Sequence, residues 1–386
     1  MKIAMVTEYL APKNKPHYGG VDARTINLAK FLSKNNDVHI ITSLIDGGKR
    51  IEDYDGVTIH RIGKKRKFTQ KGSFSQRLKF SSHIIDEILK IKPDIVDGSG
   101  FVSYSGCYKA AEKIGIPSVV TVHEVWQGEW IQNMGLINGF AGHFLEKRYL
   151  RFNFNEYISV SNFTKEKLME KLGIDKEKIT VVYNGIDIDL YKKIKVKGKY
   201  EKPTIVTVCR LVSYKRINDL INALAILKAD IPDIKLKIIG KGPHENHLIK
   251  LTKDLGLENN VEFLGKIDIT EDLIKILKKS HVFSLPSIVE GFGMVVVEAM
   301  AAGLPYVASD ISPIREVTQN GIGGFLHQPK NVEDIASKIK ILLTDDSIRD
   351  EKIKDTSRIV QKYEWLKIAN QLENCYKKIC NGGRKI

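Results

Sequence analysis

Short apolar, β-branched runs alternate with longer amphipathic segments along almost the whole chain. In the first half, segments such as 21–34 and 75–90 repeat apolar residues at the spacing of a helix. The runs between such segments predict strands at residues 3–7, 38–42, 57–61, 95–97, 118–122 and 157–160. Strand–helix alternation of this kind is typical of an α/β protein whose parallel sheets are covered by helices on both faces.

The alternation is interrupted once, at residues 192–203, which are rich in lysine, lack periodicity and end in a proline. It then resumes with predicted strands at residues 204–208, 235–239, 261–264, 282–285 and 306–308. The pattern therefore predicts two α/β halves that join near residue 200, followed by a last helix at roughly 364–378. Open parallel sheets bind ligands beyond the carboxyl ends of their strands, so two such sheets facing each other would leave a ligand cleft between them.

Composition adds that this is the sequence of a soluble protein. The 386 residues are 42% hydrophobic and 28% charged, enough to fill the cores of two or three domains. The apolar run before Glu8 is too short for a signal peptide, and no stretch offers 18 consecutive apolar residues. The four cysteines show neither zinc-ligand spacing nor a disulfide pattern. We therefore expect a cytoplasmic protein without a transmembrane helix.

The formal net charge of +15 is spread along the chain, with most of it in the first 200 residues. Such a balance suits a nucleic acid, an anionic membrane or a phosphorylated substrate as partner, although abundant lysine can also be a habit of a proteome. No nucleic-acid recognition module accompanies the charge, so we expect no nucleic-acid partner.

The sequence PSIVEGFGMVVVEAMA places two glutamates, Glu290 and Glu298, around a Gly-Phe-Gly turn. Gly291 and Gly293 allow a backbone to approach a ligand closely where the next helix begins, and the first amides of a helix attract an anion. Glu290 precedes that helix and Glu298 lies one turn inside it, so they can reach opposite ends of one extended ligand. A ligand with hydroxyls at both ends and a diphosphate in the middle is a nucleotide sugar.

This Glu-x7-Glu pattern resembles the signature of the retaining glycosyltransferases of the GT-B architecture, in particular glycosyltransferase family four. The resemblance covers nearly the whole chain. Its further matches are YGGVDARTINLA at 18–29, TVHE at 121–124, SVSNF at 159–163, YNGID at 183–187, VCRLVSYK at 208–215 and YEWLKIA at 363–369. It implies two Rossmann-like, doubly wound domains that face each other across a cleft. Residues 1–195 would bind the acceptor, 196–363 would bind the donor, and a helix within 364–386 would cross back to the first domain.

Arg210 and Lys215 stand five residues apart in a strand-to-helix loop, so both can converge on one diphosphate. By resemblance, Glu290 would hold a hydroxyl of the transferred sugar, Glu298 would hold the ribose, and His123 would lie beside the sugar. Read without the family, each of these residues is an ordinary surface charge or a core histidine.

The other donor-binding candidates lie in glycine turns or just after strands. They are Gly19, Gly20, Gly240, Leu264, Lys266, Gly291, Phe292, Gly293, Met294 and Val295. The resemblance implies no metal and no cofactor besides the nucleotide sugar, because Arg, Lys and helix amides would do the work of a cation. The Asp-x-Asp triplets at 53–55 and 187–189 are then chance matches. Cys209 departs from the family, which often has glycine there.

Two segments of the first half bear on the acceptor. One is basic: Lys64, Lys65, Arg66, Lys67, Lys71, Arg77 and Lys79. The other is apolar and aromatic: Trp126, Trp130, Ile131, Met134, Leu136, Ile137 and Phe140. The ordinary explanations are a solvated loop for the basic segment and a core helix for the aromatic one, and the sequence favours them. The functional alternative is that the first domain docks on an anionic membrane and that the acceptor is lipid-linked or bears phosphate.

The sequence thus predicts a retaining, metal-independent hexosyltransferase that uses a nucleotide diphosphate sugar, UDP rather than GDP, and acts in glycan or glycolipid synthesis. The alternative is a nucleotide-sugar 2-epimerase of the same architecture. That reaction would require a different set of acid and base residues, and the Arg210–Lys215 motif together with the paired glutamates argues against it.

Overall fold

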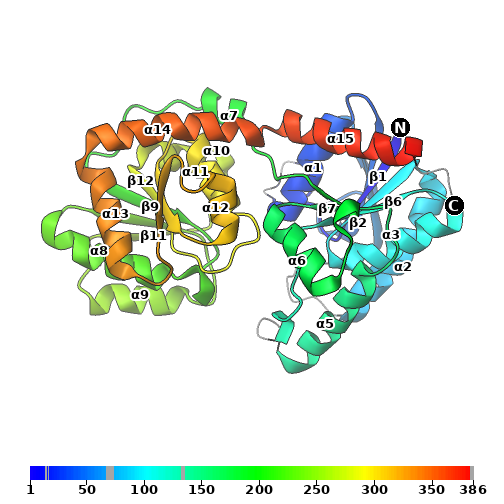
Figure 1. Cartoon of the computed structure of the whole chain (residues 1–386), viewed down its shortest axis with the longest axis horizontal. Coiled ribbons are helices and arrows are strands. Elements are labelled where there is room, and N and C mark those ends of the chain that lie inside the picture. The colour runs from blue at the N-terminus through cyan, green and yellow to red at the C-terminus, as the bar shows by residue number, and fades with distance from the viewer. Residues whose placement is uncertain (14, 16, 67–73, 132–134, 383–386) are drawn as a thin grey trace. The chain divides into compact units, whose positions relative to one another are not determined.

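The computed structural model describes residues 1–13, 15, 17–66, 74–131 and 135–382. It divides into two compact units (Figure 1). The first unit consists of Met1–Gly185 together with the C-terminal segment that begins at Trp365, and the second of Ile186–Glu364.

The described part of the first unit contains an eight-stranded sheet with the strand order β3-β4-β2-β1-β5-β6-β7-β8. Neighbouring strands are parallel except β3 and β4, which are antiparallel. The strands are β1 (Lys2–Thr7), β2 (Asp37–Ile45), β3 (Ile51–Asp53), β4 (Thr58–Arg66), β5 (Ile95–Ser99), β6 (Ser118–Val122), β7 (Glu156–Ser159) and β8 (Ile179–Val181).

Successive residues of the central strand β1 pack against different helix layers. Ile3 and Met5 belong to an apolar cluster with α1 and α15, whereas Ala4 and Val6 belong to a cluster with α2 and α3. This alternation is the period-two pattern of a strand buried on both faces. The helices are α1 (Gly20–Leu32), α2 (Phe74–Ile91), α3 (Phe101–Ile114), α5 (Leu136–Leu150), α6 (Asn162–Leu172) and α15 (Trp365–Gly382).

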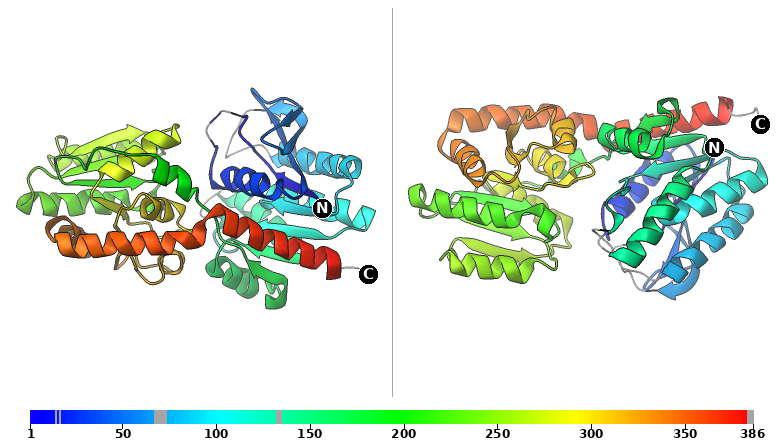
Figure 2. Two further views of the ribbon diagram at one scale, coloured as in Figure 1. Left: turned by 90° about the horizontal axis from the view of Figure 1, so that it is seen from above. Right: turned by 60° about the horizontal axis from the view of Figure 1, so that its bottom comes forward.

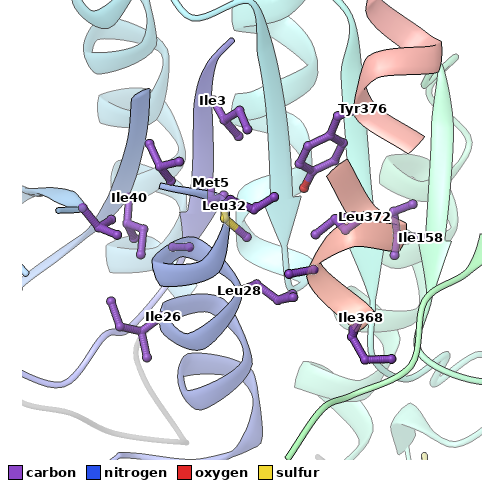
Figure 3. Packing of buried hydrophobic residues seen from close by; sticks show 14 of the residues in the cluster. Ile3, Met5, Ile26, Leu28, Leu32, Ile40, Ile158, Ile368, Leu372 and Tyr376 are labelled. Carbon is purple, nitrogen blue, oxygen red and sulfur yellow. The ribbon is translucent and has the colours of Figure 1, made fainter. Parts of the chain in front are cut away.

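The C-terminal helix α15 is part of the core of the first unit. It lies beside α1 (Figure 2). Figure 3 shows Ile368, Leu372 and Tyr376 of α15 in one cluster with Leu28 and Leu32 of α1. Ile368, Leu372 and Tyr376 are each at most 2% exposed, so the last segment of the chain completes the fold of its first half.

The second unit contains a six-stranded sheet in its described residues, in the order β11-β10-β9-β12-β13-β14, with all neighbours parallel. The strands are β9 (Thr204–Val208), β10 (Lys235–Ile239), β11 (Val261–Gly265), β12 (Val282–Leu285), β13 (Tyr306–Ser309) and β14 (Gly324–His327). The helices are α7 (Ile188–Lys193), α8 (Ile217–Asp230), α9 (Glu245–Asp254), α10 (Thr270–Lys279), α11 (Met294–Ala301), α12 (Ser312–Thr318), α13 (Val332–Thr344) and α14 (Asp346–Val360).

The predicted fold class, two Rossmann-like α/β domains, is confirmed. The predicted boundary at residues 195 and 196 differs from the division in the structure, which falls after Gly185. The prediction placed residues 186–195 in the first domain, yet Ile188 and Tyr191 are buried in the second unit. The carbonyl of Ile194 accepts a hydrogen bond from Lys278 Nζ at 2.7 Å, which ties this segment to the second unit.

Strands β3, β8 and β14 were not predicted. β3 and β8 have three residues each, fewer than a periodic pattern needs. β14 begins at Gly324, where an added Cβ would come within 2.3 Å of the Tyr306 carbonyl oxygen. The glycine that weakens the strand signal is therefore required by the neighbouring strand β13.

Candidate active site

The loops that follow β9, β10 and β12 in the second unit are joined by backbone hydrogen bonds. The amide of Leu211 donates to the carbonyl of Lys241 at 3.1 Å, and the amide of Ile288 donates to the carbonyl of Tyr214 at 3.0 Å. Because the strands are parallel, these loops lie at the carboxyl edge of the sheet, where open α/β sheets bind ligands. The bonds fix the segments that carry the predicted diphosphate-binding and sugar-binding residues.

Lys215 and Glu290 form an ion pair at this edge. Lys215 Nζ lies 2.6 Å from Glu290 Oε1, and the two side chains are only 14% and 10% exposed. The structure thus brings together two predicted site residues that are 75 positions apart. Arg210 differs, because its side chain is exposed and pairs with no described residue. The edge therefore carries two cationic side chains: Lys215, which is largely buried and paired with Glu290, and Arg210, which is exposed and pairs with no described residue.

The turn before α11 requires glycine at position 293. Gly293 has a φ of 97°, and an added Cβ would come within 2.6 Å of Ile314 Cδ1. Gly293 precedes α11, whose first amides have no partner within the helix and can bind an anion. Phe292 was predicted to bind the donor, but its ring is 5% exposed and meets the Tyr363 ring edge-on at 5.8 Å. Its side chain belongs to the core, which leaves only its backbone to a ligand.

Glu298 lies one turn inside α11, and its carboxylate has no described hydrogen-bond or ion-pair partner. Its side chain is partly buried, and this burial raises the pKa of its carboxyl from 4.5 to about 7. Met294 and Val295, in the first turn of the same helix, are partly buried as well. A carboxylate that has lost water without gaining a protein donor is well suited to accept hydrogen bonds from ligand hydroxyls.

The predicted residues after β10 and β11 have roles within the chain itself. Gly240 has a φ of 135°, and an added Cβ would come within 1.8 Å of the Cys209 carbonyl oxygen, so packing of the loops alone requires this glycine. Burial raises the pKa of the Cys209 thiol to about 12, which keeps the thiol neutral. Lys266 pairs with Asp268 at 2.6 Å, and Leu264 is partly buried on the edge strand β11.

Gly19 and Gly20 lie at the start of α1 in the first unit. The Asp22 carboxylate accepts hydrogen bonds from the amides of Tyr18 and Gly19, each at 2.8 Å, which fixes this loop. The backbone of Gly19 is extended, and an added Cβ at either glycine would meet nothing within 4 Å. The chain's own packing therefore does not require glycine at these two positions.

His123 follows β6 in the first unit. Its Nε2 lies 3.0 Å from Ser99 Oγ at the end of the neighbouring strand β5. Burial, assisted by the charge of Arg24, lowers the pKa of His123 to about 3. The imidazole is therefore neutral near pH 7 and can offer a hydrogen bond but not a positive charge.

Sequence reasoning missed two buried polar groups that support these positions. The Arg24 guanidinium donates to the carbonyls of Val182 and Tyr183, at 2.9 and 2.5 Å, and so anchors α1 to the YNGID segment. The Asp97 carboxylate accepts from Tyr376 Oη at 2.5 Å and from Thr121 Oγ1 at 2.9 Å. In both cases the periodic pattern predicts a buried apolar residue and the sequence has a charged one. A charged residue at a predicted core position is the signal that could have identified these two groups.

The basic segment of the first unit is largely engaged within the protein. Arg66 and Arg77 both contact Glu8, at 3.3 and 3.2 Å. Lys65 pairs with Asp46 at 3.1 Å. Lys67 and Lys71 lie outside the described residues. None of the helices in the part of the chain described by the structure is long and apolar enough to cross a bilayer.

The aromatic stretch divides into two groups. Trp126 and Trp130 are partly buried, and their indole nitrogens donate to Glu124 and Glu146 at 2.6 and 2.9 Å. The side chains of Leu136 and Phe140 are exposed instead. Met134 and the side chain of Ile137 lie outside the described residues. The tryptophans therefore serve the fold, and the exposed residues of the helix need another explanation.

Two family models match the chain. The model described as Glycosyltransferase Family 4 matches residues 18–190, and the model described as Glycosyl transferases group 1 matches residues 191–359. Together with the paired α/β domains, these matches define a glycosyltransferase. The chain belongs to the glycosyltransferase family 4, or group 1, enzymes, as its Glu-x7-Glu motif predicted.

Curated relatives agree with this assignment. An uncharacterized glycosyltransferase of Methanocaldococcus jannaschii is 28% identical over 395 residues, which cover 98% of both chains. The phosphatidylinositol N-acetylglucosaminyltransferase gpi3 subunit of Schizosaccharomyces pombe is 23% identical over 391 residues, covering 98% of this chain and 80% of that protein. Both are named as transferases, and neither name supports the 2-epimerase alternative.

Solved structures share the fold. Sucrose-phosphate synthase from Thermosynechococcus elongatus has a TM-score of 0.83 at 19% identity and covers 99% of both chains. An Anabaena protein solved in complex with UDP-glucose has a TM-score of 0.75 at 19% identity, covering 98% of this chain and all of that one. The architecture is therefore that of the GT-B glycosyltransferases.

Proposed function

We propose that this glycosyltransferase moves a hexosyl unit from UDP-sugar to an acceptor hydroxyl with retention of anomeric configuration and without a metal. The observation that carries the proposal is the arrangement at the carboxyl edge of the second unit. There Arg210, the Lys215–Glu290 pair, the start of α11 and Glu298, whose carboxylate pairs with no described residue, lie on loops and a helix fixed by one sheet.

The difficult charge in glycosyl transfer forms on the departing diphosphate. Arg210 and Lys215, with the first amides of α11, would stabilise that charge as it develops. Because their loops are fixed by backbone hydrogen bonds, these donors need little reorganisation. Removing one such donor costs roughly 10²–10³ in rate in other enzymes. The same cations replace the metal ion that another enzyme would need there.

The two glutamates would position the two ends of the donor. Glu298 would accept hydrogen bonds from the ribose hydroxyls, because it is the carboxylate without a described partner. Glu290 would hold a hydroxyl of the sugar and keep Lys215 oriented through the 2.6 Å ion pair. Backbone amides of Gly291 and Phe292 would complete the sugar pocket.

The first unit carries three further candidate residues. Family resemblance assigns His123 to the transferred sugar and Gly19 and Gly20 to the donor phosphates or the acceptor. The neutral imidazole of His123 suits a hydrogen bond to a sugar hydroxyl. The open space beside both glycines suits close approach of a ligand. Retention itself rests on membership of the family.

The choice of uridine is supported by the Anabaena structure, which was solved with UDP-glucose. The choice of a lipid-linked or phosphate-bearing acceptor is supported by the S. pombe relative, whose name places phosphatidylinositol as its acceptor.

The first test is a thermal-shift panel with UDP, GDP and ADP on the wild type and on Arg210→Ala. A nucleotide at a hundred times its Kd stabilises the folded protein by about 2.7 kcal/mol. We expect UDP to raise the Tm of the wild type and to have a much smaller effect on Arg210→Ala. The exposed Arg210 side chain has no described partner, so the variant without nucleotide should keep the wild-type Tm.

A matched control is Arg358→Ala, an exposed arginine on α14 that should respond to UDP as the wild type does. If only GDP or ADP raises the Tm, the proposed uridine base is wrong, but the proposed diphosphate site stands. If UDP raises the Tm of the wild type and of Arg210→Ala equally, Arg210 does not contribute to the donor site. If no nucleotide stabilises the protein, the proposed donor site is wrong.

A further inference from the structure

An ordinary surface helix packs its large apolar side chains against the protein. Helix α5 of the first unit does the opposite, because its glycines face the protein and its large apolar residues face outward. Gly139 and Gly142 are buried and face the protein. An added Cβ on Gly139 would come within 2.6 Å of Ile131 Cα, and one on Gly142 within 2.4 Å of the Trp130 ring. The inward face is therefore lined by glycine because the segment before the helix packs directly against its backbone.

The outward face carries large apolar side chains. Leu136, Phe140 and Phe144 are 75%, 70% and 61% exposed. They follow one another at intervals of four residues, so they form one stripe along the helix, which we call the α5 stripe. Single exposed apolar residues are common on protein surfaces, but a continuous stripe of two phenylalanines and a leucine marks an interaction site.

The α5 stripe continues into positive charge. Lys147 and Arg148 lie three and four residues after Phe144, are exposed and pair with no described residue. Arg151, also exposed, follows on the same side, and its Nε donates to the carbonyl of Leu172 at 3.3 Å. Glu146, the one acidic residue of α5, is 4% exposed and accepts from Trp130 Nε1 at 2.9 Å and Gln127 Nε2 at 2.8 Å. The acid is turned inward, so the outward face is apolar and then cationic.

We propose that the α5 stripe is the surface by which this enzyme binds an anionic membrane, with Leu136, Phe140 and Phe144 inserted below the headgroups and Lys147, Arg148 and Arg151 on the anionic phosphates. Apolar residues beside lysine and arginine on one helix face fit such an interface. Each cation near an anionic leaflet adds attraction that salt screens. A second copy of the chain would bring no negative charge to these three cations on its own α5.

This membrane surface rests on the proposed function, because a lipid-linked acceptor is the reason for the enzyme to bind a membrane. The proposal itself concerns membrane binding and not glycosyl transfer. Its test therefore needs no donor sugar and no acceptor. The position of the stripe also differs from the basic segment at Lys64–Lys79, whose described arginines Arg66 and Arg77 contact Glu8.

The experiment is sedimentation of the full chain with vesicles of phosphatidylcholine alone and of phosphatidylcholine mixed with phosphatidylglycerol, at low and high salt. We expect the wild type to bind the anionic vesicles, less so as salt rises. Phe140→Ser with Phe144→Ser should weaken this binding by about tenfold or more, because both rings lose their apolar contact. Lys147→Glu with Arg148→Glu should remove the preference for anionic lipid.

A matched control is Ile226→Ser with Ile269→Ser, two exposed apolar residues of the second unit that are 45% and 61% exposed. It should bind vesicles as the wild type does. Each variant must keep the Tm and the UDP-induced shift of the wild type, which separates loss of the stripe from loss of the fold or of the donor site. The proposal is overturned if the wild type ignores anionic vesicles at low salt or if the control loses binding equally. A dimer in light scattering that Phe140→Ser with Phe144→Ser dissolves, without vesicle binding, would assign the stripe to a second copy instead.

Discussion

At the scale of single residues, the two glutamates of the signature motif differ in what surrounds them. Glu290 forms an ion pair with Lys215, whose Nζ lies 2.6 Å from Glu290 Oε1. Glu298 has no described partner, and burial raises its carboxyl pKa to about 7. One carboxylate thus has a cation of the protein beside it, while the other becomes fully charged only above neutral pH or with a ligand that donates to it.

We predict that UDP binding releases a proton from Glu298. In the free protein the raised pKa leaves this carboxyl mostly protonated below about pH 7. Ribose hydroxyls that donate to the carboxylate favour its charged form and lower its pKa, so affinity for UDP should rise as the pH rises towards 7 and then level off. Calorimetry at about pH 6 in buffers of different ionisation enthalpy measures the released proton directly.

Glu298→Gln is the control, because it keeps the shape of the side chain and cannot titrate. It should bind UDP without releasing the proton. The raised pKa of Glu298 also makes the stability of the folded protein depend on pH, in the direction opposite to that of an ion-paired carboxylate. A folded pKa raised above the unfolded value contributes stability at low pH that is lost as the pH rises through about 7. Unliganded Glu298→Gln should therefore gain stability relative to the wild type as the pH rises. Equal proton release in both proteins would contradict this assignment.

At the scale of elements, glycines with the same sequence signal serve different purposes. Gly240 and Gly293 are needed where one loop passes over another part of the second unit, as their positive φ values and close contacts show. Gly19 has an extended backbone and no such contact. A glycine-rich loop therefore indicates close approach without saying whether the approaching group is the protein itself or a ligand.

Alanine substitutions should separate these two cases. Gly19→Ala should keep the wild-type Tm, because the new methyl group meets no protein atom within 4 Å, and should lower the transfer rate if a ligand uses that space. Gly240→Ala should lower the Tm strongly, because its Cβ would lie 1.8 Å from the Cys209 carbonyl oxygen. Thermal unfolding and the rate of donor-sugar hydrolysis or transfer measure the two effects. A large loss of Tm in Gly19→Ala would place that glycine in the structural group.

At the scale of the whole molecule, the C-terminal segment that begins at Trp365 is part of the first unit. Trp365 packs directly on Gly185, where an added Cβ would come within 2.2 Å of the indole ring. Farther along α15, Tyr376 Oη donates to the buried carboxylate of Asp97, whose pKa is raised by burial. The first unit is therefore not a continuous piece of sequence, and its stability depends on residues that follow the second unit.

We predict that a chain that stops after Glu364 does not fold its first unit. It loses the buried side chains of Trp365, Ile368, Leu372 and Tyr376, each of which stabilises the fold by roughly 1.5–3 kcal/mol when fully buried. Their sum, on the order of 10 kcal/mol, is comparable to the whole stability of a typical domain. Circular dichroism and limited proteolysis should show a folded second unit beside an unfolded first half. A chain that stops after Gly382 keeps α15 and should behave as the wild type; similar protease resistance of both truncations would refute the prediction.

The sequence by itself determined the features that depend on neighbouring residues. The alternation of runs predicted β6, β9, β10 and β12 with their observed bounds, because buried parallel strands are rich in apolar and β-branched residues. Even β10, where Lys235 and Lys237 alternate with apolar residues, keeps this signal. Local spacing also singled out the two glutamates and the Arg210–Lys215 loop, since each motif spans only a few residues after the end of a strand.

The tertiary structure decided what depends on residues far apart in the chain. Only packing placed Lys215 on Glu290, turned the Phe292 ring into the core and assigned residues 186–195 to the second unit. It also turned Glu146 inward and left Phe140 and Phe144 outside on α5. The physical reason is that periodicity reports which side of an element is apolar, whereas the partner of a charge and the cover of an apolar face depend on other elements that the local pattern does not contain.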